Sequence, residues 1–407
     1  MTLSRIGRIS RAFVVSMAVV LGMSACGGYT VGFMWVLGTQ YNQIAGFKID
    51  DYTGNLTTMV NSPYSSGGVN PVSIAVRIGG NFVFVVNKGT VNSKGASNGD
   101  GNVSVFAVGE DGILTYQASY STAGNTPVWA SSDGTGSFLY VLDAQAPDFA
   151  TTGNGDITVF AVDGGTGRLQ LVPNQLIKDP QGHQLNYFEV GPAPTMLRNG
   201  GACLYTLDSG DQTIYPYGVG GSGQLTVESN SRYQVPQAPA TNITSMNVSG
   251  NNIYLTDAAN NQILPFNSGS GCSLAPQVGG KVTNLPTTSD PVYSLTDSKN
   301  KFLYVLNHGN TVNGNNANST ISAYVIESTG ALVPISDPSN PYPVGNGPVC
   351  MVEDPSNQYV YTSNNNDGTL TGKFINANTG QLSDLSRGSS FPATGLATCL
   401  AVSGNVD

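Results

Sequence analysis

The stretch Phe302–Asn307 (FLYVLN) returns almost unchanged as Phe138–Asp143 (FLYVLD). Looser copies begin at Phe82, Cys203, Asn252 and Tyr359. Each copy is rich in aromatic and branched residues and ends in Asn or Asp, which is the chemistry of a β-strand followed by a turn. The recurrence predicts a fold assembled from many copies of one β-unit.

A proline marks the start of most units. Each of five prolines lies 16 residues before the closing Asn or Asp, and Thr241 has the same place before Asp257; the prolines are Pro71, Pro127, Pro192, Pro291 and Pro348. Proline fits the first position of a strand, where its missing N–H costs least. An apolar segment such as Val72 to Ile78 follows and predicts the first strand of the unit.

Two further strands complete the unit. A segment with period-two alternation follows each closing Asn or Asp, as in Ile157 to Phe160. A hairpin turn such as Thr166-Gly167 then leads to a poorer fourth strand, for example Leu332 to Ile335. Four antiparallel strands in roughly 50 residues are typical of a propeller blade. Six such units run from Pro71 to about Leu385.

The chain ends supply a seventh unit. Phe33 to Leu37, Ile44 to Ile49 and Leu56 to Val60 resemble second, third and fourth strands, and Leu396 to Val402 resembles the missing first strand. We therefore predict an all-β, seven-bladed β-propeller of four-stranded antiparallel blades, one domain over residues 33–407, with the ring closed by the N- and C-terminal strands. A stacked solenoid is the alternative, but it needs capping repeats, which the sequence does not suggest.

The first 25 residues predict an export signal. Arg5, Arg8 and Arg11 precede a short apolar run from Ala12 to Gly22, which is too short to span a bilayer. The segment resembles a bacterial lipoprotein signal cut before Cys26, although Met23 stands where Leu is commoner. We expect lipidation of Cys26, a tether over residues 26–32 and a location in the cell envelope. An ordinary signal peptide with an incidental Cys is the alternative.

Charge narrows the choice of partners. The chain holds 16 Lys and Arg against 25 Asp and Glu, and three of the basic residues lie before Cys26, so the mature chain carries 13 minus 25, or −12. Such a chain is a poor partner for nucleic acid. We expect membrane contact only through the lipid, a monomer, a small molecule or an envelope protein as partner, and no metal or cofactor.

Four cysteines follow Cys26, and export permits disulfides. Cys350 and Cys399 fall on corresponding inner strands of neighbouring repeats, so we favour that pair, which leaves Cys203 with Cys272. Free buried thiols are the alternative.

The long connections all belong to one face of the predicted ring, which we call the decorated face. They are Lys88 to Gly101, Ala144 to Gly155, Pro173 to Gly191 and His308 to Ser319. Long loops on one face of a rigid scaffold commonly carry binding sites.

The Asn or Asp that closes each second strand lies on the same face. These residues are a candidate pocket rim, with Trp129 and Tyr293 as candidate plugs of the channel; they are Asn87, Asp143, Asp208, Asp257, Asn307 and Asn364. The alternative, favoured by their repetition, is that each side chain caps its own turn. His308 and His183 are the only histidines and weak candidates for a general base.

The repeated order of Pro-led strand, Phe-Leu-Tyr-Val-x-Asn strand and Ile-Ser-x-Tyr strand followed by Thr-Gly-x-Leu resembles the propeller lactonase family, which includes 6-phosphogluconolactonase-like and muconate-cycloisomerase-like proteins. Members commonly carry Arg-His just after the leading Pro. Here those places read Val72-Ser73, Val128-Trp129, Ala193-Pro194, Val292-Tyr293 and Val349-Cys350.

This departure separates two hypotheses. The first is an envelope binding or scaffold protein with lost or altered catalysis. The second is a lactone hydrolase or cycloisomerase that acts in the envelope.

Overall fold

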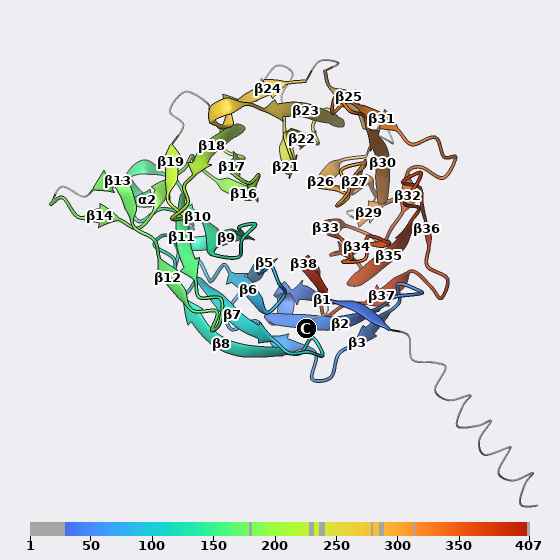
Figure 1. The fold of residues 1–407 in the computed structure, drawn as a ribbon, viewed down its shortest axis with the longest axis horizontal. Coiled ribbons are helices and arrows are strands. Elements are labelled where there is room, and N and C mark those ends of the chain that lie inside the picture. The colour runs from blue at the N-terminus through green and yellow to red at the C-terminus, as the bar shows by residue number, and fades with distance from the viewer. Residues whose placement is uncertain are drawn as a thin grey trace, which may run out of the picture.

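The computed structural model describes residues 29–178, 181–227, 232–235, 241–277, 280–284, 289–312 and 315–404. Seven antiparallel sheets stand around a central channel, as Figure 1 shows down the ring axis. The predicted seven-bladed propeller is confirmed. The predicted signal segment and Cys26 lie outside the described residues.

Six blades follow one another along the chain, each with its first strand innermost. Blade one is β5 (Pro71–Val76), β6 (Phe82–Asn87), β7 (Asn102–Val108) and β8 (Leu114–Tyr120); blade two is β9 (Asn125–Ser132), β10 (Phe138–Gln145), β11 (Asp156–Val162) and β12 (Leu169–Leu171); blade three is β16 (Pro194–Asn199), β17 (Cys203–Asp208), β18 (Thr213–Val219) and β19 (Leu225–Val227). Blade four is β21 (Ile243–Ser249), β22 (Asn252–Asp257), β23 (Gln262–Ser268) and β24 (Leu274–Pro276); blade five is β26 (Pro291–Thr296), β27 (Phe302–Asn307), β30 (Thr320–Ile326) and β31 (Leu332–Pro334); blade six is β33 (Pro348–Glu353), β34 (Tyr359–Asn364), β35 (Thr369–Ile375) and β36 (Leu382–Asp384).

The seventh blade joins the two ends of the chain. Its order is β38 (Ala397–Gly404), β1 (Thr30–Gly38), β2 (Gln43–Asp50) and β3 (Leu56–Thr58), so the C-terminal strand is innermost. Figure 1 shows β38, in red, beside the blue β1. Trp35 pairs with Ala401, and Gly38 pairs with Ala397. A Cβ at Gly38 would collide with the Thr394 carbonyl, which explains why this blade lacks the closing Asn or Asp.

The outer strand of most blades is interrupted. A short second piece pairs with the same third strand; these pieces are β4 (Tyr64–Ser65), β15 (Phe188–Glu189), β20 (Tyr233–Gln234), β25 (Val282–Thr283), β32 (Tyr342–Pro343) and β37 (Ser390–Pro392). Blade one has one continuous outer strand instead. The poorer apolar pattern predicted for the fourth strands agrees with their position at the solvated rim.

Two blades depart from the predicted spacing. Pro71 faces Asn87 as expected, but Asp208 faces Pro194 and Asp257 faces Ile243. The predicted starts Pro192 and Thr241 are therefore wrong by two residues. The turn between the first two strands is shorter in these blades: β16 ends at Asn199 and β17 begins at Cys203, whereas β5 ends at Val76 and β6 begins at Phe82.

In four blades an aromatic side chain of the second strand is hydrogen-bonded to the next blade. Trp35 Nε1 donates a hydrogen bond to the Gly112 carbonyl at 3.1 Å, and the Tyr304 hydroxyl donates to the Gly380 carbonyl at 3.1 Å. Tyr254 makes the same bond to Gly330, and Tyr361 makes it to Gly54 across the closure of the ring. The repeated aromatic thus fills the core between blades and satisfies a hairpin carbonyl there.

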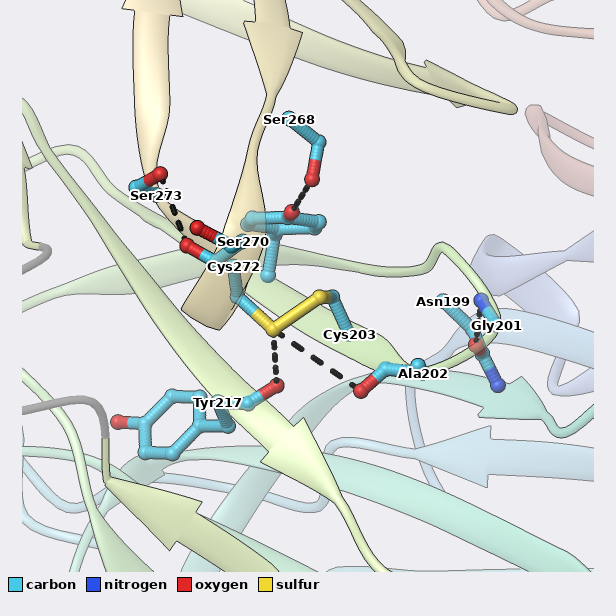
Figure 2. Close-up of a disulfide and its surroundings, with 10 residues drawn as sticks. Asn199, Gly201, Ala202, Cys203, Tyr217, Ser268, Ser270, Cys272 and Ser273 are labelled. Atoms are coloured by element: carbon cyan, nitrogen blue, oxygen red, sulfur yellow. Dashed lines mark hydrogen bonds between the residues drawn. A yellow bond between two sulfur atoms is a disulfide. The ribbon is translucent and has the colours of Figure 1, made fainter.

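A disulfide joins Cys203 of β17 to Cys272 in the 3-10 turn η2 (Ser270–Cys272) of the next blade. Figure 2 shows it beside the carbonyls of Ala202 and Tyr217. Cys203 with Cys272, the pair that the sequence analysis leaves after pairing Cys350 with Cys399, is therefore a disulfide. The favoured pair is not bonded: Cys350 and Cys399 are buried free thiols whose sulfurs lie 3.4 Å apart.

The long connections carry small elements of their own. They include α2 (Phe149–Thr152), the hairpin β13 (Asn174–Lys178) and β14 (Gln184–Leu185), and the hairpin β28 (Asn310–Val312) and β29 (Asn315–Ala317), while η1 (Thr39–Tyr41) forms the short turn between β1 and β2. The β13–β14 hairpin extends from the rim of the ring in Figure 1. Among the described residues, no helix has the length and apolar character to cross a membrane.

Candidate functional site

A cavity of about 270 Å³ opens inside the ring, and all seven inner strands contribute to its wall. Except for Trp129, which is the fifth residue of β9, the lining residues lie one or two places after the start of each inner strand, at the end next to the decorated face; the full set is Val72, Trp129, Thr195, Met196, Thr244, Val292, Tyr293, Val349, Cys350, Thr398 and Cys399. We call this space the central cavity. Its wall is largely apolar and aromatic, as in most small-molecule sites.

A repeated backbone irregularity builds the wall. In every blade the ladder between the first and second strands shifts register near the decorated end, for example between Pro71 and Ser73 and between Pro291 and Tyr293. Val72 and Val292 are the extra residues of these two bulges. β-Bulges bend a strand and re-aim its side chains, so seven copies of one bulge form a ring of side chains around the channel.

Arg198, on β16, holds two aromatic side chains of the cavity wall in place. Its guanidinium carbon lies 4.8 Å from the ring centroid of Trp129 and 5.4 Å from that of Tyr293. One terminal nitrogen donates to the Tyr293 hydroxyl at 3.0 Å, and Nε donates to the Met246 carbonyl at 2.9 Å. Cation–π contacts and charge-assisted hydrogen bonds therefore fix both rings.

Trp129 and Tyr293, the predicted plugs, thus form part of the cavity wall and leave a space beside them. Burial is the main cause that raises the pKa of the Tyr293 hydroxyl above its usual range, and the nearby Arg198 charge opposes this. Sequence reasoning missed Arg198. The register of its strand was hidden by the misplaced start at Pro192, and the pair of residues at the Arg-His place is Thr195-Met196 instead of Ala193-Pro194.

The two free thiols belong to the same wall. Cys350 and Cys399 both line the cavity and lie on the neighbouring inner strands β33 and β38. A hydrogen bond from the Cys399 thiol is the main cause that lowers the pKa of Cys350 below its usual range, with a smaller contribution from the positive charge of Arg198. Cys350 is therefore the thiol with more thiolate character at neutral pH.

The six predicted rim residues lie elsewhere. All are fully buried, and none lines the cavity; they are Asn87, Asp143, Asp208, Asp257, Asn307 and Asn364. Asn364 donates to Thr369 and Thr371 of its own blade, and Asp257 accepts from its own turn at Asn260. The rim prediction is corrected, because these side chains point into their blades and hold the second strand to the loop and the third strand.

The two histidines are also outside the central cavity. His308 Nδ1 lies 3.3 Å from the Asp290 carboxylate, at the start of a long connection on the decorated face. His183 is exposed in the link between blades two and three. Neither is placed to act on a molecule held by the described cavity wall.

The geometry defines a class: a seven-bladed β-propeller with a small aromatic cavity at one end of its channel. The resemblance to the propeller lactonases is confirmed, since residues 29–182 match the family model described as "Lactonase, 7-bladed beta-propeller".

Solved structures share the fold over almost the whole chain. The periplasmic gluconolactonase PpgL of Pseudomonas aeruginosa is 16% identical with a TM-score of 0.68, over 92% of this chain and 99% of that one. A Bacteroides fragilis protein provisionally assigned as a 6-phosphogluconolactonase is 16% identical with a TM-score of 0.67, over 91% and 98%. AztD of Citrobacter koseri is 11% identical with a TM-score of 0.53, over 92% and 99%. No curated protein matches the chain.

Proposed function

We propose that this chain binds a small, neutral, ring-shaped molecule, such as a sugar or a lactone, in the central cavity. The observation that carries the proposal is the pair of aromatic rings, Trp129 and Tyr293, that Arg198 holds rigid in the cavity wall. Immobilised aromatic faces suit the flat apolar face of a ring. A cavity of about 270 Å³ is slightly smaller than the usual range for ligand sites, which begins at about 300 Å³, so one ring would fill it.

The polar groups of the wall support a neutral ligand. Thr244 already donates to the Pro291 carbonyl at 2.6 Å, and the Thr398 hydroxyl lies 3.0 Å from that of Thr39. Among the described residues that line the cavity there is no Asp, Glu or His. Hydrolysis with a general base would need such a group within hydrogen-bond reach of the attacking water. Binding is therefore the function that the wall supports better.

Tryptophan fluorescence can test the proposal, because the chain has only two tryptophans and Trp35 is fully buried. We expect sugars or lactones to change the emission of the protein in a saturable way and the Trp129→Phe variant to lose that response. Val72→Trp, which fills the cavity, should abolish binding detected by calorimetry. Val333→Trp, at an exposed position on the rim, is the matched control. Absence of binding across a broad panel of neutral ring compounds would overturn the proposal.

A lactone hydrolase is the second candidate. The observation that favours it is the Cys350 thiol, which lines the cavity and has a lowered pKa, since a thiolate can attack an ester carbonyl. Lactone turnover that is lost in Cys350→Ser but kept in the surface variant Val333→Ser would establish this alternative over binding alone.

We propose in addition that the chain is exported and lipid-anchored at Cys26, with residues 1–25 removed. The basic start, the short apolar run and Cys26 in the sequence support this, as does the periplasmic location stated for the similar P. aeruginosa protein. Mass spectrometry of the mature N-terminus should find diacylated Cys26. A Cys26→Ser variant should leave the membrane fraction. An unmodified Met1 in the mature protein would contradict the proposal.

A further inference from the structure

The closing residue of each second strand has a fixed partner, the first residue of the third strand. In four blades the two side chains form a direct hydrogen bond in which one partner is an amide donor: Asn87 with Asn102, Asp257 with Gln262, Asn307 with Thr320 and Asn364 with Thr369. Blade two breaks this complementarity. There Asp143 pairs with Asp156, so two carboxylates face each other where other blades place a donor with an acceptor.

Both carboxylates of this pair are fully buried. The Thr122 hydroxyl donates to Asp143 at 2.7 Å, and the Thr158 hydroxyl donates to Asp143 at 3.2 Å. Each hydroxyl has only one proton to give: that of Thr158 is directed to Asp143, and that of Thr122 is shared between Asp143 and the Gly124 carbonyl at 3.2 Å. Asp156 has no hydrogen-bond donor on either oxygen, and it is the one carboxylate among the described residues with both oxygens buried and unpartnered. Burying such a charge is very costly unless something positive compensates it.

Gly124 shows how close the Asp156 carboxylate lies to a main-chain oxygen of the neighbouring strand. A Cβ at this residue would collide with Asp156 Oδ1, and it would also lie 2.8 Å from the Gln145 carbonyl oxygen and 2.9 Å from the Asp143 Cβ. The Asp156 carboxylate oxygen and the Gln145 carbonyl oxygen therefore lie less than 5 Å apart, close enough to share one cation beside Gly124, and the Asp143 side chain begins next to them. Asp148 Oδ1, on the connection that follows Gln145, is another buried oxygen without a partner, and Glu189 pairs with Asp156 in the sheet.

We propose that Asp143 and Asp156 bind a calcium ion together with the Gln145 carbonyl. Two carboxylates neutralise a divalent cation, and calcium accepts main-chain carbonyls and water in an irregular shell. No group of three or more His, Cys, Asp or Glu side chains gathers into a metal site in the described ranges, so main-chain oxygen and water complete the shell. The ion would fasten β10, β11 and the segment before β9, the strand that carries Trp129 of the central cavity.

The test compares the chelator-treated full chain with Asp156→Asn. We expect calcium chloride to bind the full chain with one site by calorimetry and to raise its melting temperature. Asp156→Asn should bind calcium at least about tenfold more weakly and lose the thermal response. In EDTA the variant should melt at or above the temperature of the unsubstituted chain, because its amide can donate to Asp143 as Gln262 does to Asp257. Because Asp156→Asn is expected to stay folded, a loss of calcium binding in this variant can be attributed to the missing carboxylate.

Asp290→Asn is the matched control: it removes one carboxylate from the decorated face in another blade and should keep the calcium response. If calcium neither binds nor stabilises the unsubstituted chain, the proposal is overturned. The same holds if Asp156→Asn and the unsubstituted chain respond alike. A result in which only Asp156→Asn is more stable, with no calcium effect on either protein, would show that the pair holds a proton instead. These outcomes are independent of ligand binding in the central cavity.

Discussion

Arg198 contacts side chains of blades two and five and a carbonyl of blade four, although it belongs to blade three. Repeat analysis could find Trp129 and Tyr293, because both stand at a recurring position after a proline. It could not find Arg198, because the role of this residue depends on contacts of one side chain with two aromatic rings from other blades. Individual contacts across a ring leave no periodic trace in the sequence.

Glu353, on β33, offers a pH test at the scale of one side chain. Burial raises its pKa from 4.5 to about 7, a hydrogen bond from the Ser298 N–H opposes this, and Asp297 and Asp354 add to the rise. Below pH 4.5 the group is protonated in the folded and unfolded chains alike. Between pH 4.5 and 7 only the unfolded chain loses the proton, so this group lowers the free energy of unfolding as the pH rises, by about 1 kcal/mol after solvent screening.

Glu353→Gln should therefore be more stable than the unsubstituted chain at pH 8 and equal to it at pH 4, as measured by urea unfolding across this range. Its amide oxygen can still accept from Ser298. Glu110→Gln, at an exposed position, should show no such pH-dependent difference. A stability difference for Glu353→Gln that is the same at pH 4 and pH 8 would contradict the argument.

Among the structural elements, the second strands carry a matched pair of tyrosines. The Tyr304 hydroxyl binds the Gly380 carbonyl, whereas the Tyr140 hydroxyl is buried without a partner. We expect Tyr304→Phe to lower the free energy of unfolding by about 1–2 kcal/mol, because it leaves a buried carbonyl unpaired. Tyr140→Phe should be neutral or stabilising. Chemical denaturation measures both, and equal losses in the two variants would refute the proposed role of this bond.

The strands β33 and β38 carry the two thiols of the cavity. A disulfide needs the sulfurs at about 2.05 Å, so the observed 3.4 Å separation requires only a small movement. We expect diamide to oxidise Cys350 and Cys399 to a disulfide while the diamide is reduced. The mass should fall by two hydrogens, two titratable thiols should disappear, and the melting temperature should rise. Closing a loop of this separation, 49 residues, stabilises by about 4 kcal/mol in the chain-entropy view. Thiols that remain titratable after diamide treatment would contradict this expectation.

The blades were predictable because each strand type recurs with its own signature. The second strand was the clearest, since its buried aromatic and closing polar residue serve the same purpose in nearly every blade. The starts of β16 and β21 were misplaced because a proline or threonine at fixed spacing does not reveal a shorter turn. The six closing Asn and Asp residues do not form the candidate rim; as their repetition favours, they bond within their own blades. A recurring Asn or Asp predicts where a strand ends, but it does not predict whether the side chain points to the channel or into the blade.

For the whole molecule, ring closure depends on β38. Ala397, Leu400 and Ala401 are buried there, and the strand completes the blade that begins the chain. A chain that ends at Gly395 should lose cooperative unfolding or melt at a much lower temperature, because β1 is left with an open edge and the neighbouring inner strands β5 and β33 lose the strand that packs between them. A chain that ends at Gly404 keeps β38 and should melt like the full chain. An unchanged melting temperature for the shorter chain would overturn the closure.

The arrangement of the seventh blade also sets an order of events in time. Its strands β1, β2 and β3 are synthesised before the other six blades, and their inner neighbour β38 is synthesised after them. While the ribosome synthesises the six blades in between, the inner edge of β1 in the seventh blade has no partner strand. At roughly 5–20 residues per second, that interval lasts tens of seconds. The blade whose strands are made first is therefore completed last. Until β38 is synthesised, the inner edge of β1 is the place where the incomplete propeller is most exposed to pairing with a strand of another chain.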